Sequence, residues 1–264
     1  MGFGIFSKSS ECPIAEERRL YLDRCFRWLA ANFTEALFEK RVFTPSEEDF
    51  PINFSATAEN AYEFLDIIAP QMDLDSDDID IEFYAEGESE LVTGAGSYAR
   101  IFLRPAEHEK TSAGHYRGKN EDGHYLIGLN SRSMNDPGNL VATIAHELAH
   151  IKLLGEGRLS KNNESLTDLT TIVFGFGIFG ANAATSFKTG GFSWSHGSQG
   201  YLMEMDWGYA LALHAHMRRD EASWINFLKP NVRSDFDQSR RFIDANRDVI
   251  LLPPPTNNDA ATNE

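Results

Sequence analysis

Five consecutive residues near the middle of the chain carry side chains that can bind a metal ion and move a proton. His146-Glu147-Leu148-Ala149-His150 forms the pattern H-E-x-x-H. Residues four apart share one face of an α-helix, so His146 and His150 can bind one zinc ion while Glu147 points at a water molecule on that zinc. The apolar surface that would bury such a helix comes from its neighbours: Val141, Ile144, Ala145, Leu148 and Ala149.

The third protein ligand of a catalytic zinc ion must come from elsewhere in the chain, because such a site takes three protein ligands and keeps one position open. Residues 163–168 (NESLTD) are the expected source. Glu164 and Asp168 lie four apart at the start of a predicted helix and therefore share a face. We expect Glu164 to bind the metal and Asp168 to accept a hydrogen bond from the free ring nitrogen of a ligand histidine.

The two motifs together, H-E-x-x-H and N-E-x-x-T-D, resemble the gluzincin class of zinc metallopeptidases; the resemblance covers residues 124–168. It implies a zincin-like fold, a Zn²⁺ cofactor and hydrolysis of a peptide or protein substrate with Glu147 as general base. Glu164 follows His150 by only 14 positions. That spacing is shorter than in the thermolysin-like members and indicates a compact variant. An aspzincin-like arrangement also fits, with Asp168 as third ligand and Glu164 outside the ligand set.

Peptide hydrolysis further requires a donor to the developing oxyanion and a surface that binds the substrate backbone. A Gly-rich loop over residues 186–200 delivers three candidates for oxyanion or substrate contacts, although residues of these types are more often structural: His196, Tyr201 and Tyr209. The strand predicted just before the H-E-x-x-H helix would bind substrate by edge addition. Tyr125 to Asn130 is therefore the expected wall of the cleft.

A competing function of another class uses the same residues. The chain could be a zincin-like zinc-binding regulatory or binding protein that keeps the metal site and cleaves nothing. Glu147 favours the enzyme, because a structural zinc site has no need of a base and closes its fourth position with another ligand.

Hydrophobic periodicity predicts the elements that would hold these residues. Helices are expected over 16–40, over 57–69 with Thr57 as N-cap and Pro70 as stop, over 137–154 after the cap Asp136-Pro137, from Asn163 through Phe176, over 201–219 and within 222–250. Strands are expected over 79–83, 99–103, 114–117 and 124–129. In the first strand, Asp80 and Glu82 lie opposite the apolar residues and predict a solvated face.

These elements predict an α+β fold. A small mixed sheet would pack on the H-E-x-x-H helix in a zincin-like core, and the C-terminal half would be mainly helical. We expect an N-terminal region, 1–90, packed on a catalytic core, 91–250, and a disordered tail, 251–264. The apolar stretch FGFGIFGANAA predicts a buried helix rather than a membrane span, because Asp168, Asn182 and several threonines interrupt it.

The chain is acidic, and most of the excess charge lies in one segment. Its 24 Lys and Arg against 40 Asp and Glu give a formal charge of −16, and the segment from Val42 to Ala99 holds 15 of the acids and no Lys or Arg. This balance excludes nucleic acid as a partner and disfavours an anionic membrane surface. Cys12 and Cys25 are too few for a disulfide framework, and Cys25 is expected as a buried free thiol. Without a secretory signal, the expected location is cytoplasmic.

Overall fold

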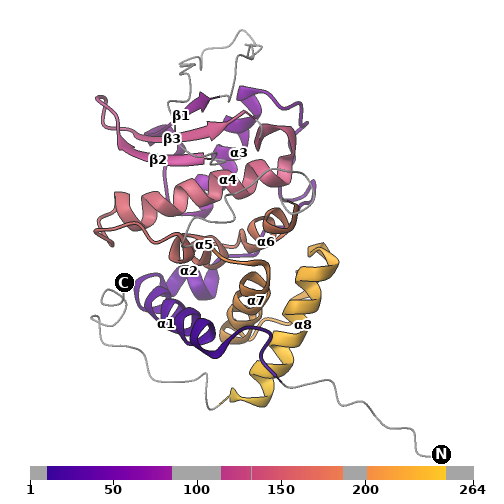
Figure 1. The fold of residues 1–264 in the computed structure, drawn as a ribbon. Coiled ribbons are helices and arrows are strands. Elements are labelled where there is room, and N and C mark those ends of the chain that lie inside the picture. Colours follow the sequence, from indigo (N-terminus) through magenta and orange to yellow (C-terminus); the bar gives the residue numbers. More distant parts are fainter. Residues whose placement is uncertain (1–10, 85–113, 132, 187–200, 248–264) are drawn as a thin grey trace, which may run out of the picture.

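The computed structural model describes residues 11–84, 114–131, 133–186 and 201–247. Within these ranges the chain has an α+β fold that is mainly helical, as predicted, with one small mixed sheet. Figure 1 shows the sheet at one end of the molecule, with α4 (Pro137–His150) crossing beneath it. At the other end lie α1 (Glu16–Asn32), α7 (Glu204–Arg218) and α8 (Pro230–Ala245).

The sheet has three strands in the order β1-β3-β2. The central strand β3 (Tyr125–Asn130) pairs in parallel with β1 (Ile79–Tyr84) and in antiparallel with β2 (Gly114–Lys119). The prediction that β3 binds substrate by edge addition is therefore wrong, since both of its backbone edges are already paired. Periodicity reveals that a segment is a strand, but the order of strands depends on long-range pairing.

The predicted solvated face of β1 is only partly correct. Glu82 is buried, whereas Asp80 is not. Glu82 lies opposite Gly128 of β3. Arg117 of β2 forms an ion pair with Glu82, at 2.7 Å between Nη1 and Oε2. The ion pair allows a carboxylate to be buried at this position.

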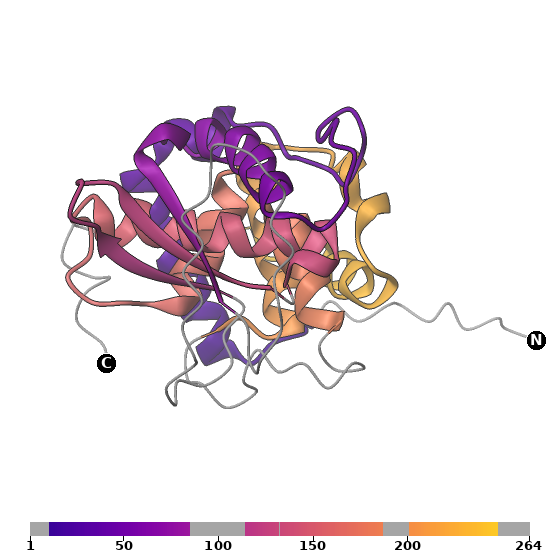
Figure 2. The same ribbon diagram turned by 90° about the horizontal axis from the view of Figure 1, so that it is seen from above.

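The N-terminal helices depart from the predicted ranges in two places. The helix expected over 16–40 is broken at Phe33 into α1 and α2 (Thr34–Glu39), and the Phe33 ring packs edge-on against Phe174. The next helix, α3 (Ala58–Gln71), begins as predicted, because the Thr57 side chain accepts a hydrogen bond from Asn60 N. Pro70 lies inside its last turn instead of stopping it, and the helix ends one residue later. Seen from above, α3 and α4 lie side by side (Figure 2).

The H-E-x-x-H helix α4 starts where the sequence predicts. Asp136 Oδ1 accepts from Asn139 N at 2.8 Å, and Pro137 is the first helical residue. After His150 the helix does not continue as α but widens into a π-helical turn, Ile151–Gly155. A Cβ atom at Gly155 would lie 2.8 Å from the Tyr125 ring. Glycine therefore lets this turn press against the sheet.

The helix predicted from Asn163 onward forms two elements, α5 (Glu164–Val173) and α6 (Gly177–Ser186). They are separated at Gly175, whose φ of +94° is open to glycine. A Cβ atom on Gly180 would lie 2.4 Å from the Trp207 ring, so α6 packs directly against α7. The apolar stretch FGFGIFGANAA thus lies in the interior of the protein, as predicted. No helix in the described ranges combines the length and the apolar character needed to cross a bilayer.

The N-terminal region shares its core with the rest of the chain. It supplies β1 to the sheet, and α1 packs against α5. In the C-terminal part, a short 3-10 helix, Ser223–Phe227, and α8 lie within the predicted range 222–250, of which the structure describes residues 222–247. Cys25 is a buried free thiol, as predicted, and burial raises its pKa to about 11. The predicted strand over 99–103 and the predicted tail lie outside the described residues.

Candidate metal centre

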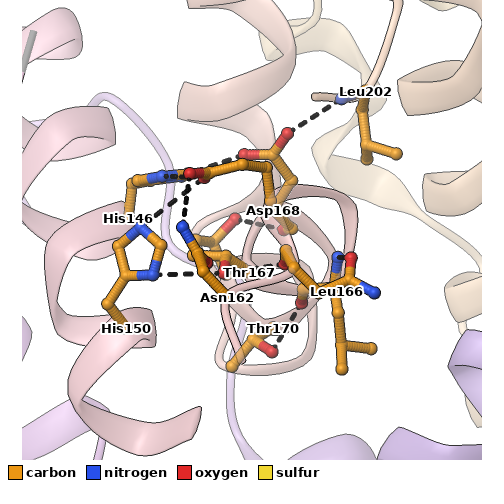
Figure 3. A network of polar contacts seen from close by, with 11 residues as sticks. His146, His150, Asn162, Leu166, Thr167, Asp168, Thr170 and Leu202 are labelled. Carbon is orange, nitrogen blue, oxygen red and sulfur yellow. Dashed lines mark hydrogen bonds and ion pairs between the residues drawn. The ribbon is translucent and has the colours of Figure 1, made fainter. Parts of the chain in front are cut away.

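Helix α4 presents both of its histidines to α5, as Figure 3 shows. His146 and His150 are buried, with ring centroids 4.8 Å apart and ring planes at 85°. The four-residue spacing thus places both rings on one face of α4, as the motif predicts.

The start of α5 completes a group of three ligand atoms. Asn163 caps this helix by accepting a hydrogen bond from Leu166 N at 3.0 Å, which makes Glu164 its first residue. Glu164 Oε2 lies 3.2 Å from His146 Nε2 and 3.6 Å from His150 Nε2. In the part of the chain that the structure describes, these three residues form the one group that could hold a metal ion, and we call them the metal cluster.

The three ligand atoms lie within 4.8 Å of one another, and two of their three separations fit a small divalent ion. Around a tetrahedral ion with bonds of about 2.0–2.1 Å, neighbouring ligand atoms lie about 3.3–3.4 Å apart. The 3.2 and 3.6 Å separations bracket this value. The alternative in which Asp168 replaces Glu164 is not supported, because Asp168 faces Nδ1 of His146 rather than Nε2.

Hydrogen bonds on the far side of each imidazole direct Nε2 toward Glu164. His146 Nδ1 donates to Asp168 Oδ1 at 3.0 Å, and Asp168 Oδ2 accepts from the backbone N–H of Leu202 at 3.0 Å (Figure 3). The Thr167 hydroxyl donates to the Asn163 carbonyl, so its oxygen accepts from His150 Nδ1 at 3.4 Å. Each ring is therefore held with a proton on Nδ1 and Nε2 facing the cluster.

Glu147 differs from the other carboxylates of the site. It is 1% exposed, and its Oε2 has no hydrogen-bond partner among the described residues. Burial raises the pKa of Glu147 to about 8, against the opposing effect of His146. A buried carboxylate oxygen without a partner is costly, so its presence beside the cluster suits a group that meets a bound ion or an incoming molecule.

The charges of the site favour a cation. Burial alone would lower the pKa of His146, but hydrogen bonds to Asp168 and Glu164 raise it to about 10. For His150, burial and the charge of His146 lower the pKa to about 3. Burial would raise the pKa of Glu164, yet the hydrogen bond with His146 holds it well below its usual range. The carboxylates of Asp168 and Glu164 therefore stabilise positive charge where the three ligand atoms meet.

Of the predicted oxyanion or substrate contacts that the structure describes, Tyr201 lies at the cluster and Tyr209 does not. The Tyr201 ring stacks on His146 with centroids 5.7 Å apart, and its hydroxyl hydrogen-bonds to Glu164. Burial and the nearby carboxylates raise the pKa of Tyr201, so its hydroxyl keeps its proton. The Tyr209 hydroxyl instead donates to Asp23 Oδ1 at 2.7 Å, between α7 and α1. His196 lies outside the described residues.

Two further side chains contact the cluster without having been predicted. Asn162 Nδ2 donates to Glu164 Oε1 at 2.7 Å. Its position in the sequence, next to the N-cap Asn163, could have indicated that Asn162 lies near Glu164. The Tyr116 ring of β2 stacks on His150, with centroids 6.5 Å apart and an interplanar angle of 15°. No local pattern marks Tyr116, because only the packing of the sheet on α4 brings it there.

Comparisons of this chain with protein-family models, with curated proteins and with solved structures return no match. The function must therefore be inferred from the site itself. The site offers two imidazole nitrogens and one carboxylate oxygen around a point, with a second carboxylate, of which one oxygen has no partner among the described residues, beside them.

Proposed function

We propose that this protein is a zinc-dependent metallopeptidase with a zincin-like catalytic core of the gluzincin type. The observation that carries the proposal is the combination of the metal cluster with Glu147, whose Oε2 is unpaired among the described residues. Two histidines and one glutamate are a ligand set of catalytic zinc sites, which leave a position open, whereas a structural zinc site is closed by a fourth ligand.

Zinc held by His146, His150 and Glu164 would polarise a peptide carbonyl and lower the pKa of a water molecule toward neutrality. Glu147 takes the proton of the attacking water and later delivers it to the leaving amine. This role is supported by the position of Glu147 directly after His146 on α4 and by the charge interactions of Glu147 with His146 and Glu164. Asp168 and Thr167 keep the two imidazoles oriented throughout.

Tyr201 is the proposed donor to the oxyanion. Among the described candidates, it is the one whose ring and hydroxyl both contact the ligands, and its hydroxyl remains protonated. A hydroxyl so placed can turn from Glu164 toward developing negative charge on the substrate. The substrate backbone is expected along β2, which in the described ranges pairs only with β3 and carries Tyr116 against His150.

The variant Glu147→Gln tests the proposal directly. It should retain zinc but hydrolyse an unstructured protein about 10²–10⁴-fold more slowly, because it removes the general base and leaves the ligands intact. Glu156→Gln is the matched control, since the Glu156 carboxylate pairs with Lys152 and Arg158 rather than facing the metal cluster. That variant should keep both zinc and activity.

Equal hydrolysis by wild type and Glu147→Gln would refute the assigned role of Glu147. A zinc-loaded wild type that cleaves nothing across a broad peptide library would refute the peptidase. The second result would leave a zinc-binding protein without proteolytic activity as the function of the site.

A further inference from the structure

The metal cluster is contacted indirectly from α1, in the N-terminal part of the chain. Two residues on one face of that helix reach the first turn of α5. The Tyr21 hydroxyl donates to Asn163 Oδ1 at 3.1 Å, and Arg18 Nη2 donates to Ser165 Oγ at 3.2 Å. Asn163 and Ser165 are the two chain neighbours of Glu164, so α1 holds the third ligand from both sides.

Arg18 also holds the start of α7. Its Nε and Nη2 lie 3.0 and 2.9 Å from Asp206 Oδ2, and Asp206 is fully buried. The same Asp206 oxygen accepts from the backbone N–H of Met203 at 2.9 Å. The preceding residue, Leu202, donates its N–H to Asp168, the partner of His146. One guanidinium therefore connects the segment beside Glu164 with the segment beside Asp168.

We infer that Arg18 is a positioning residue for the metal cluster: it ties the first turns of α5 and α7 together and so sets the separation of Glu164 from His146. The planar, rigid fork of a guanidinium suits this role, because it bonds Ser165 and Asp206 at fixed angles. The inference rests on the proposed function only in that the cluster binds a metal ion, and it does not depend on peptide hydrolysis.

The neighbouring Arg19 provides a matched comparison on the same helix. It is buried, its Nη1 donates to Asp23 Oδ2 at 2.7 Å, and its guanidinium lies over the Phe242 ring of α8. None of these contacts involves the first turns of α5 or α7. Loss of Arg19 should therefore destabilise the fold without moving the ligands, whereas loss of Arg18 should change the ligand geometry.

The test measures Zn²⁺ affinity by competition with a chelator, and the visible absorption of the Co²⁺-loaded protein, on the full chain. Arg18→Met should bind Zn²⁺ about tenfold more weakly, as expected when a group that orients ligands is lost, and should alter the Co²⁺ spectrum. Arg19→Met should lower the unfolding temperature, yet keep the Zn²⁺ affinity within about twofold and the Co²⁺ spectrum unchanged.

Removal of Arg18 leaves the buried charge of Asp206 uncompensated, which destabilises the protein. If Arg18→Met does not fold, the double variant Arg18→Met/Asp206→Asn takes its place, because it removes that charge and keeps an oxygen for Met203 N–H. Wild-type Zn²⁺ affinity in the folded variant, or an equal loss in Arg19→Met, would overturn the role of Arg18 and leave the proposed function standing. A folded wild type that binds no Zn²⁺ would overturn both.

Discussion

Two buried polar clusters lie among the helices, and they differ in how completely their hydrogen bonds are closed. The first, here called the α1–α7 cluster, consists of Arg19, Asp23 and Tyr209. Its two Asp23 oxygens each accept one hydrogen bond of 2.7 Å: Oδ2 accepts from Arg19, and Oδ1 accepts from Tyr209. In the metal cluster, three ligand atoms face one point, and the neighbouring Glu147 has an oxygen unpaired within the described ranges. The first arrangement stabilises the fold, and the second keeps groups available for chemistry.

The difference teaches that burial of charge does not by itself mark a functional site. Burial raises the pKa of Asp23 and of Tyr209, just as it raises that of Glu147. A shifted pKa is thus common to both clusters. What separates them is that both acceptor oxygens of Asp23 are occupied by donors of the α1–α7 cluster, while the ligand atoms of the metal cluster converge on a point that a cation can occupy.

The largest expected effect is stabilisation by zinc, which under the proposal would bind the folded chain through groups that the unfolded chain does not bring together. At a free zinc concentration about 1,000 times the dissociation constant, the free energy of unfolding should rise by about 4 kcal/mol. Denaturant unfolding with and without a chelator measures this increment. Asp23→Asn should lower the free energy of unfolding with and without zinc by the same amount, so the increment due to zinc is kept. If Glu164→Gln shows the same increment as the wild type, zinc binds outside the metal cluster.

The next effect concerns two tyrosines that the sequence does not distinguish. Tyr209→Phe leaves a buried oxygen of Asp23 without its donor, so the free energy of unfolding should fall by about 1–3 kcal/mol while Zn²⁺ affinity stays unchanged. Tyr201→Phe should instead lower the hydrolysis rate with little change in stability. Urea unfolding and peptide hydrolysis measure the two effects. A loss of Zn²⁺ affinity in Tyr209→Phe would break the distinction between the clusters.

The smallest effect tests how His150 is oriented. Thr167→Val removes the acceptor of His150 Nδ1 and should weaken Zn²⁺ binding about tenfold. Thr170→Val on the same helix is the control, because the Thr170 hydroxyl donates only to the Leu166 carbonyl in the contacts described and touches neither histidine. Chelator competition compares the two variants. If both lose equal affinity, the effect belongs to the stability of α5 and not to the orientation of His150.

The sequence predicts those parts of the fold that local patterns determine. Asp136-Pro137 and Asn163 are caps whose side chains mark the starts of α4 and α5, and both helices begin there. The break at Phe33 and the central position of β3 were not predicted, because packing against Phe174 and pairing with β1 involve residues distant in sequence. Glu82 was misplaced for the same reason, since its burial depends on Arg117 of another strand.

The residues of the candidate site likewise fall into two groups, those that local spacing predicts and those that it does not. Spacings of four residues place His146 with His150 on α4, and Glu164 with Asp168 on α5, and the structure brings the two pairs together. Tyr116, the Leu202 N–H and Arg18 reach the site only through tertiary packing. Motif spacing therefore predicts the ligands and their nearest partners, while the groups that hold those partners become visible only in the fold.

The most direct test of the central claim, that His146, His150 and Glu164 hold one zinc ion, is the zinc content of the purified full chain after loading and dialysis. The wild type and Glu147→Gln should each retain about one zinc per chain, and a folded Glu164→Gln should retain far less. A wild type that is fully folded and retains no zinc would contradict the account.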